Sequence, residues 1–392
     1  MFRLKFSLVV AITLCAAHPL MAGTFAVGSC KPKSPSFATI SAAVSSVPPG
    51  STILVCPGIY PEQVTITQPL NLSGVTDSNQ NLALITVPST GLVANAVSVF
   101  GESIAAQLLV QGAGPVSITD IAVDGTGGDL GCAGSTWVAG IFYSPGSSGL
   151  VNHAKVNNQT DAGCGVGLWA ENTDGADKFV TFQNNSVHGQ DGFGIFGSSN
   201  ASTPNLFLST RGNVVSPALG LIGIGLDNVT GSVSGNNVAN ALFGIVNTSS
   251  AGSLTFNTVS VASAGIALQG GGTVNNNTIY DSSIGLWLFS DGGVVHQNRI
   301  SNATVSAVEF NCSAAIVSSN TINDAAIGLN NAPVGFTGNN SFTNTETIKG
   351  GGCAAALARA SVATANTPAP AAKMGTSIWE WRTPASPNGT LK

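Results

Sequence analysis

Three carboxylates that lie close together in the sequence are the first candidates for chemistry. They are Glu171, Asp174 and Asp191. A pair of carboxyl groups can act as acid and as base or nucleophile at a glycosidic bond, so these are the predicted catalytic residues if the chain is an enzyme. Whether it is an enzyme stays open at this stage. The sequence identifies no cofactor and predicts no metal site.

An aromatic stripe is predicted beside these carboxylates. Phe142, Trp169 and Phe196 each follow a glycine by two residues, in strands whose alternate side chains should face outward. Exposed aromatic rings are good platforms for flat sugar rings, so the three are predicted to bind substrate. The alternative is that longer loops, at residues 124–139 and 170–178, fold over the stripe and bury it.

A repeat must position these side chains. The phrase Asn, any residue, aliphatic (once Phe) recurs at intervals of 20 to 28 residues, beginning at Asn185, Asn213, Asn236, Asn257, Asn277, Asn298, Asn320 and Asn340. A second phrase, a small residue followed by alternating apolar residues, lies between these, as at Gly265–Leu268 and Gly285–Leu288. Two phrases that share one period of this size predict a solenoid.

The composition of the repeat favours strands over helices. Each unit has two short runs of alternating apolar residues separated by turn-forming residues, which predicts strand, turn, strand, turn. Asparagine tolerates the left-handed backbone of a sharp turn, and stacked side-chain amides can hydrogen-bond from one coil to the next. The alternative is that some of these asparagines carry N-linked glycans.

This combination resembles the repeats of the pectin lyase-like superfamily, over roughly Ser36 to Thr347. The resemblance implies an all-β fold, a single-stranded right-handed parallel β-helix. It does not imply one activity, because the superfamily includes lyases, hydrolases, esterases, epimerases and proteins with no known reaction. Asn172-Thr173-Asp174-Gly175 is similar to the first motif of polygalacturonases, but the other motifs of that family are missing.

A short N-terminal helix is also expected. Ser36 can cap it, and its apolar face would consist of Phe37, Ile40, Val44 and Val47. The helix and the strands that follow resemble the opening of pectinesterases. The resemblance implies a structural role, in which the helix covers the apolar end of the first coil.

Three segments are predicted along the chain. Residues 1–22 have a basic start, an apolar run and small residues, as in a secretory signal peptide, and no later stretch is long enough to span a membrane. Residues 23–350 form the β-helix domain. Residues 351–392 form an Ala/Pro-rich linker and tail, in which Trp379 and Trp381 could bind sugar, dock on the helix end or serve export; docking is favoured.

Composition narrows the compartment and the partners. Only 8% of the 392 residues are charged and the formal net charge is −5, which disfavours nucleic acid as a partner. Six cysteines remain after signal cleavage, an even number typical of exported proteins. Proximity in the sequence favours, among fifteen connectivities, the pairs Cys30–Cys56, Cys132–Cys164 and Cys312–Cys353.

Taken together, these features predict a secreted, cell-surface or periplasmic protein. We expect it to contact polysaccharide along one face, either as a polysaccharide lyase or glycoside hydrolase or without catalysis. The alternative function is a surface, adhesion or spacer protein in which the solenoid is only a rigid rod.

Overall fold

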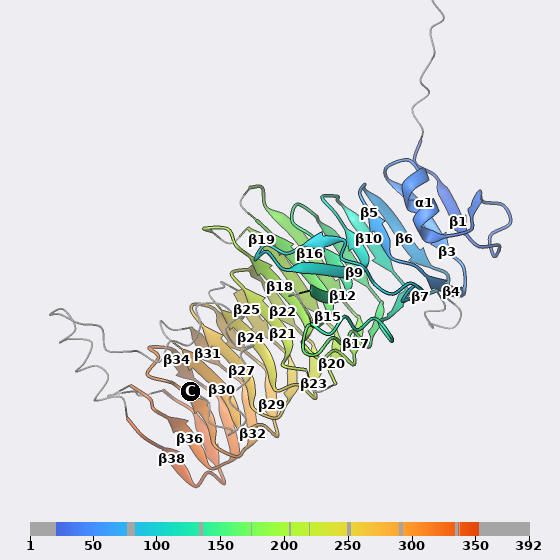
Figure 1. The fold of residues 1–392 in the computed structure, drawn as a ribbon. Coiled ribbons are helices and arrows are strands. Elements are labelled where there is room, and N and C mark those ends of the chain that lie inside the picture. Colours follow the sequence, from blue (N-terminus) through green and yellow to red (C-terminus); the bar gives the residue numbers. More distant parts are fainter. Residues whose placement is uncertain are drawn as a thin grey trace, which may run out of the picture.

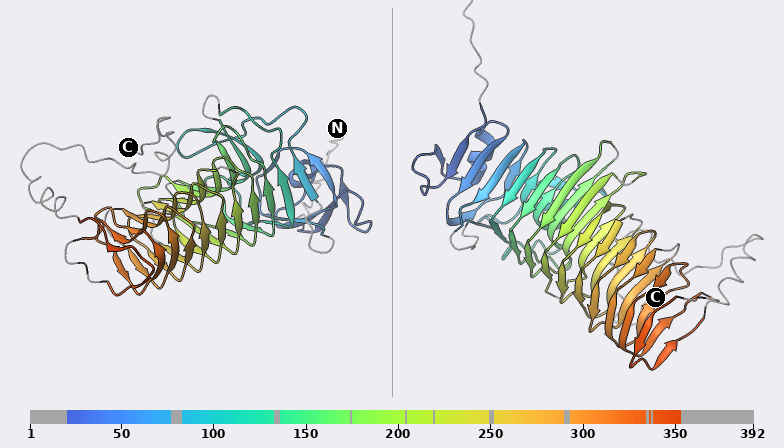
Figure 2. Two further views of the ribbon diagram at one scale, coloured as in Figure 1. Left: turned by 90° about the horizontal axis from the view of Figure 1, so that it is seen from below. Right: turned by 180° about the vertical axis from the view of Figure 1, so that it is seen from behind.

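The chain forms a stack of coils in which the strands of successive coils pair in parallel (Figure 1). The computed structural model describes residues 21–76, 83–132, 136–173, 175–203, 205–218, 220–248, 252–289, 293–333, 336 and 338–352. Three long sheets, here named A, B and C, run the length of an elongated body (Figure 2). This is the predicted right-handed parallel β-helix, and the prediction of the fold is confirmed.

Each coil contributes one strand to each sheet. Sheet A consists, in order, of β2 (Ser36–Phe37), β1 (Thr24–Val27), β3 (Ser51–Val55), β6 (Leu70–Gly74), β10 (Val116–Thr119), β13 (Gly149–Asn152), β16 (Lys178–Gln183), β19 (Leu206–Arg211), β22 (Thr230–Ser234), β25 (Gly252–Thr255), β28 (Thr273–Asn275), β31 (Val294–His296) and β34 (Ile316–Ser318). Sheet B consists of β4 (Gly58–Pro61), β7 (Ala83–Thr86), β11 (Ile121–Asp124), β14 (Lys155–Asn157), β17 (Ser186–His188), β20 (Val214–Ser216), β23 (Asn237–Ala239), β26 (Thr258–Ser260), β29 (Thr278–Tyr280), β32 (Arg299–Ala303), β35 (Thr321–Ala325) and β37 (Ser341–Thr343).

Sheet C carries the longest strands. It consists of β5 (Val64–Ile66), β9 (Ser103–Val110), β12 (Thr136–Tyr143), β15 (Gly165–Asn172), β18 (Phe193–Ser199), β21 (Ile222–Asp227), β24 (Phe243–Thr248), β27 (Ala264–Gln269), β30 (Ile284–Phe289), β33 (Ser306–Glu309), β36 (Ile327–Asn330) and β38 (Thr347–Lys349). A two-residue strand, β8 (Ala96–Val97), pairs antiparallel with β9.

Three strands per coil correct the sequence prediction of two. In the regular repeat the predicted strands belong to sheets B and C and the missed ones to sheet A, whereas β3 and β10 of sheet A were predicted. A strand such as β25 is four residues long and buries one aliphatic side chain, Leu254, between small polar residues. So short an alternation cannot be told from a turn by its pattern alone.

The asparagine column forms a continuous ladder at the corner between sheets A and B. The side-chain Nδ2 of Asn257 donates to Oδ1 of Asn277 at 2.9 Å, and Nδ2 of Asn236 donates to Oδ1 of Asn257 at 3.0 Å. The same bond links every consecutive pair from Asn185 to Asn340. The predicted amide ladder is therefore confirmed. Because the side chain of Asn257 is 1% exposed and bonded within the stack, it offers no room for a glycan.

From Asn185 to Asn320, the left-handed turn residue is the one before each ladder asparagine and not the asparagine itself. Phe256 has φ of 57° and Asn276 has φ of 54°, whereas Asn257 and Asn277 are not among the residues with positive φ. Asparagine is thus required in the ladder for its side-chain amide. The preceding residue, whose type varies, adopts the left-handed turn conformation.

Close packing explains the glycine of the second phrase. A Cβ atom built on Gly265 would lie 2.3 Å from Cγ2 of Ile279 and 2.7 Å from the carbonyl oxygen of Gly285. Sheets B and C approach each other at this corner, so only a small residue fits at the start of the sheet C strand. The inward side chains that follow, such as Ile245, Ile266 and Leu286, stack in the core.

The N-terminal helix exists but begins later than predicted. Helix α1 (Ile40–Ser46) is capped by Thr39, whose side chain accepts a hydrogen bond from the Ala42 amide. Ser36, the predicted cap, belongs to strand β2. The Glu62 carboxylate accepts from the backbone amides of Ile40 and Ser41, both at 2.9 Å, and so satisfies two of the free amides of the first turn.

Two of the three predicted disulfides are present. Cys30 bonds to Cys56 near the N-terminal end of the stack, and Cys132 bonds to Cys164 beside sheet C. Cys353, the predicted partner of Cys312, lies outside the described residues.

In the part of the chain that the structure describes, no helix is both long and apolar enough to cross a membrane.

Candidate functional site

The predicted aromatic stripe is placed on the outer side of sheet C, in register on adjacent coils. Phe142 pairs with Trp169, and Trp169 pairs with Phe196. Their ring centroids are 5.1 Å and 5.7 Å apart. All three side chains are 0% exposed, because they belong to a second apolar cluster outside the β-helix core. We name this second cluster the outer cluster.

A segment from another coil covers the outer cluster. Residues 87–102, here the covering segment, precede β9 and include β8, and Ala96 packs against the cluster. The amide of Val99 donates to Oε2 of Glu171 at 2.9 Å, and Nδ2 of Asn200 donates to the carbonyl of Val99 at 2.9 Å. The rings are therefore buried, as the alternative in the sequence analysis had it. Their cover includes residues 87–102, which lie outside the loops at 124–139 and 170–178 that the prediction named, and Cys132 of the first of those loops also packs against the cluster. Contact of the rings with substrate stays a prediction that requires the covering segment to move.

Glu171 lies beneath the covering segment with 1% of its surface exposed. Its Oε1 accepts from the Ser198 hydroxyl at 3.0 Å, and its Oε2 accepts from Val99. Burial raises the pKa of Glu171 to about 8, because an ionised carboxylate loses its hydration there. In this arrangement Glu171 holds a loop in place, and its predicted catalytic role stays a prediction.

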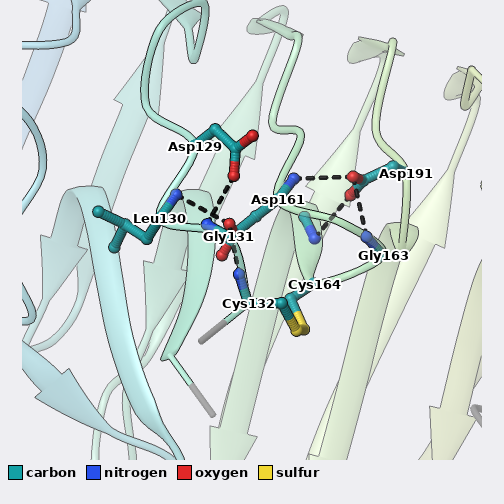
Figure 3. The surroundings of a disulfide bond; sticks show 9 residues. Asp129, Leu130, Gly131, Cys132, Asp161, Gly163, Cys164 and Asp191 are labelled. Atoms are coloured by element: carbon teal, nitrogen blue, oxygen red, sulfur yellow. Dashed lines mark hydrogen bonds between the residues drawn. A yellow bond between two sulfur atoms is a disulfide. The ribbon is translucent and has the colours of Figure 1, made fainter. Parts of the chain in front are cut away.

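Asp191 lies at another place, in the loop between sheets B and C. Its Oδ2 accepts from the amides of Asp161 and Gly163 at 2.7 and 2.9 Å, and its Oδ1 accepts from Gly165 at 2.9 Å (Figure 3). One coil earlier, Asp161 repeats this arrangement. Its Oδ1 accepts from the amides of Leu130 and Cys132, both at 2.8 Å.

These two aspartates join the loops of successive coils beside the disulfide between Cys132 and Cys164 (Figure 3). Burial, and after it the neighbouring Asp129, raise the pKa of Asp161 to about 6. Asp174, the third predicted carboxylate, lies outside the described residues. The structure therefore does not bring Glu171 and Asp191 together as an acid and base pair, since each is bonded to backbone amides of a different loop.

Replacing Asp191 with alanine should lower the free energy of unfolding by about 2 kcal/mol, because three backbone amides lose a charged acceptor. Asp191→Asn, which keeps one acceptor oxygen, should lose less. Urea unfolding of both variants measures the difference. If neither variant is destabilised but polysaccharide turnover is lost, Asp191 acts in chemistry and not in loop structure.

A stacked aromatic pair on the outer side of sheet A, with one ring exposed and one half-buried, was not predicted. Phe179 on β16 and Phe207 on β19 are in register, and their rings stack with centroids 4.8 Å apart and planes inclined by 17°. Phe179 is 60% exposed. The signal in the sequence was a phenylalanine at the second position of two consecutive sheet A strands, which could be found only once those strands were recognised.

Polar side chains extend this surface along the same strands. Thr181 and Ser209 follow the rings by two residues in register, and Gln183 and Arg211 follow by four. Nε of Arg211 donates to Oε1 of Gln183 at 2.7 Å. We name these six residues the sheet A face; it combines an aromatic platform, hydroxyl groups and a guanidinium about 13 Å from the rings, at about 3.3 Å per residue.

Other features of the described residues offer less chemistry. A hollow of about 700 Å³ at the corner between sheets B and C has one carboxylate among its described lining residues, Asp281, whose Oδ1 accepts from Asn302 at 2.8 Å. No group of three or more His, Cys, Asp or Glu within the described ranges is placed to hold a metal ion. The Asp124 carboxylate accepts from the amide and the hydroxyl of Thr126.

Comparison with known proteins finds similarity of fold to solved structures. No protein-family model and no curated protein sequence matches the chain. Among solved structures, the catalytic domain of a GH87 α-1,3-glucanase is similar with a TM-score of 0.51 and 13% identity, over 88% of this chain and 68% of that chain.

Two further structures are similar at lower scores. The GH136 lacto-N-biosidase of Eubacterium ramulus has a TM-score of 0.49 and 12% identity, over 84% of this chain and 67% of that one. The A-module of the mannuronan C-5 epimerase AlgE4 of Azotobacter vinelandii has a TM-score of 0.48 and 14% identity, over 79% and 90%. At these identities the likeness concerns the fold.

Proposed function

We propose that this chain, which has the parallel β-helix fold of the pectin lyase-like superfamily, is an exported protein that contacts polysaccharide along the sheet A face. The observation that carries the proposal is the stacked pair of Phe179, which is 60% exposed, and Phe207, which is half-buried. Solvent-exposed aromatic pairs on an otherwise polar surface mark contact sites, because each exposed ring is unfavourable in water.

The chemistry of the sheet A face suits a glycan. Flat aromatic faces pack against the apolar side of a sugar ring, while threonine and serine hydroxyls and the amide of Gln183 can exchange hydrogen bonds with sugar hydroxyls. The Arg211 guanidinium adds a donor for a carboxylate or hydroxyl of the polymer. Because the six residues lie on two adjacent parallel strands, the face is a strip about 13 Å long that follows the strands and could hold a few sugar units.

The comparisons support this choice of ligand. The GH87 α-1,3-glucanase domain was solved in complex with tetrasaccharides, so a β-helix of this kind can present a face to a glycan. Export rests on the signal-like residues 1–22, of which 1–20 lie outside the described part, and on the two disulfides, since such bonds persist in oxidising compartments.

Replacing Phe179 and Phe207 with alanine should raise the apparent Kd for the bound polymer about 10-fold or more, because each ring is expected to contribute on the order of 1 kcal/mol. Affinity electrophoresis on pectin, alginate and related polymers measures this. Phe256→Ala is the matched control, since Phe256 is 65% exposed at a corner away from the sheet A face.

The same screen decides between contact and catalysis. Product formation from each polymer is followed for the wild type beside Glu171→Gln, which removes the only predicted catalytic carboxylate under the covering segment. If the wild type binds none of the polymers, the rigid-spacer function replaces the proposal. If Phe256→Ala weakens binding as much as the double variant does, the contact does not lie on the sheet A face.

A further inference from the structure

The outer side of sheet C stays apolar well beyond the covering segment. On β24, β27 and β30, outward side chains alternate with core side chains: Ala267 belongs to the outer cluster, whereas its neighbours Ile266 and Leu268 belong to the core. The outward residues of these strands in the outer cluster are Phe243, Val246, Ala264, Ala267, Trp287 and Phe289. Although they project from the outer side, Val246 is 0% and Trp287 is 9% exposed. We name these six residues the distal patch.

The covering segment is too far away to account for this burial. Its described hydrogen bonds reach Glu171 on β15 and Asn200, which directly follows β18. Trp287 lies on β30, four strands further along sheet C (Figure 1), or about 19 Å at 4.8 Å per strand. The distal patch therefore calls for a second apolar partner.

We propose that residues 377–381 of this same chain pack on the distal patch. The segment reads Ser377-Ile378-Trp379-Glu380-Trp381, and in an extended conformation its two tryptophans face one side while Glu380 faces the other. Two aromatic side chains on one face of a short strand match a patch that contains Phe243, Trp287 and Phe289. This surface differs from the helix end, on which the sequence analysis expected the tail to dock.

The length of the connecting chain fits the distance. The last described residue, Gly352, follows the last strand of sheet C, β38, by three residues, and β38 is four strands from β27 at the centre of the patch, again about 19 Å. Between Gly352 and Ser377 lie 24 residues rich in Ala, Thr and Pro. A chain of 24 residues can span at most about 80 Å, so the patch is within reach, and attachment to the same chain gives the segment a high effective concentration there.

Charge also favours this partner. Residues 353–392 contain four basic side chains and one acidic side chain, whereas the whole chain has a formal net charge of −5. At the edge of the patch, Trp287 is in register with Glu309 on the next strand. In the same extended conformation Arg382 alternates with Trp381 and faces away from the patch, so the charge argument depends on the net positive charge of the tail as a whole.

The test uses the full chain with a thiol probe in the patch. Ala267 is 1% exposed, and its replacement by cysteine changes the side-chain volume little. The rate at which the thiol of Ala267→Cys reacts with a maleimide therefore reports whether the patch is covered. With the tail intact we expect slow labelling, and Trp379→Ala with Trp381→Ala should accelerate labelling about 10-fold or more. Ser253→Cys on the outer side of sheet A is the control and should react at the same rate in both backgrounds.

Addition of the tail in trans separates docking from misfolding. A synthetic peptide of residues 375–384 should restore slow labelling to the double variant, whereas the same peptide with both tryptophans changed to alanine should not. Labelling that stays slow in the double variant overturns the proposal. If light scattering then shows a dimer, a second copy covers the patch instead. Polysaccharide binding by the sheet A face is not needed for any of these outcomes.

Discussion

Replacing Asn257 with alanine is expected to lower the free energy of unfolding by about 3 to 5 kcal/mol, a large part of what holds a typical domain folded. Its Oδ1 accepts from both the backbone amide and the side chain of Asn236, at 3.0 Å each. Its Nδ2 donates to the carbonyl of Val233 and to Oδ1 of Asn277, at 2.9 Å each. Alanine leaves four buried polar groups without this partner, and each unsatisfied group is unfavourable by about 1 to 3 kcal/mol.

The comparison that isolates the ladder is Ser253→Ala in the same coil. Ser253 faces outward from sheet A, so its loss should change the unfolding midpoint in urea very little. Equal losses for Ser253→Ala and Asn257→Ala would mean that stacking of aliphatic side chains, and not the amide ladder, stabilises the corner.

The ladder could be predicted from the sequence because every coil requires the same residue type, an asparagine, at the same corner. A buried amide needs a partner in both neighbouring coils, so asparagine recurs at Asn236, Asn257 and Asn277, and its period is visible without coordinates. The strands of sheet A do not require one particular residue type at a fixed position. Its strands bury one or two aliphatic residues per coil and expose Ser, Thr or Asn, so β25 and its neighbours looked like turns.

The candidate site could be predicted only in part, for a different reason. The outward direction of Phe142, Trp169 and Phe196 follows from strand alternation, and the structure places them so. Their exposure depends on a segment that contacts Glu171 from 72 residues earlier in the chain. Local periodicity cannot predict such a contact, because the contact depends on how a long loop folds back over neighbouring coils.

Replacing Glu171 with glutamine is expected to change the pH dependence of stability. The folded pKa of Glu171 is about 8, above its ordinary value of 4.5, so the folded chain binds a proton that the unfolded chain releases between these two values. The stability of the wild type should therefore be greatest below about pH 4.5 as far as this group is concerned. It should fall progressively as the pH rises towards 8.

Glutamine has no proton to take up on folding and keeps an acceptor for the Val99 amide. Stability curves of Glu171→Gln and wild type should therefore lie close together near pH 4.5 and diverge above it, with the variant more stable at pH 8 by on the order of a few kcal/mol. Thermal or urea unfolding at a series of pH values measures the divergence. Ser198→Ala, which removes the hydroxyl partner but keeps the carboxyl, should retain the falling stability.

The same series tests whether Glu171 controls the covering segment. Ionisation above pH 8 places a charge beneath residues 87–102, so the outer cluster of the wild type should become accessible to an apolar dye, while that of Glu171→Gln should stay covered. Parallel stability curves for wild type and Glu171→Gln across this range would show that the carboxyl is hydrated in the folded chain. The covering segment would then be held by its other contacts, which include the pairing of β8 with β9, the hydrogen bonds of Asn95 to Ala106 and the bond from Asn200 to Val99.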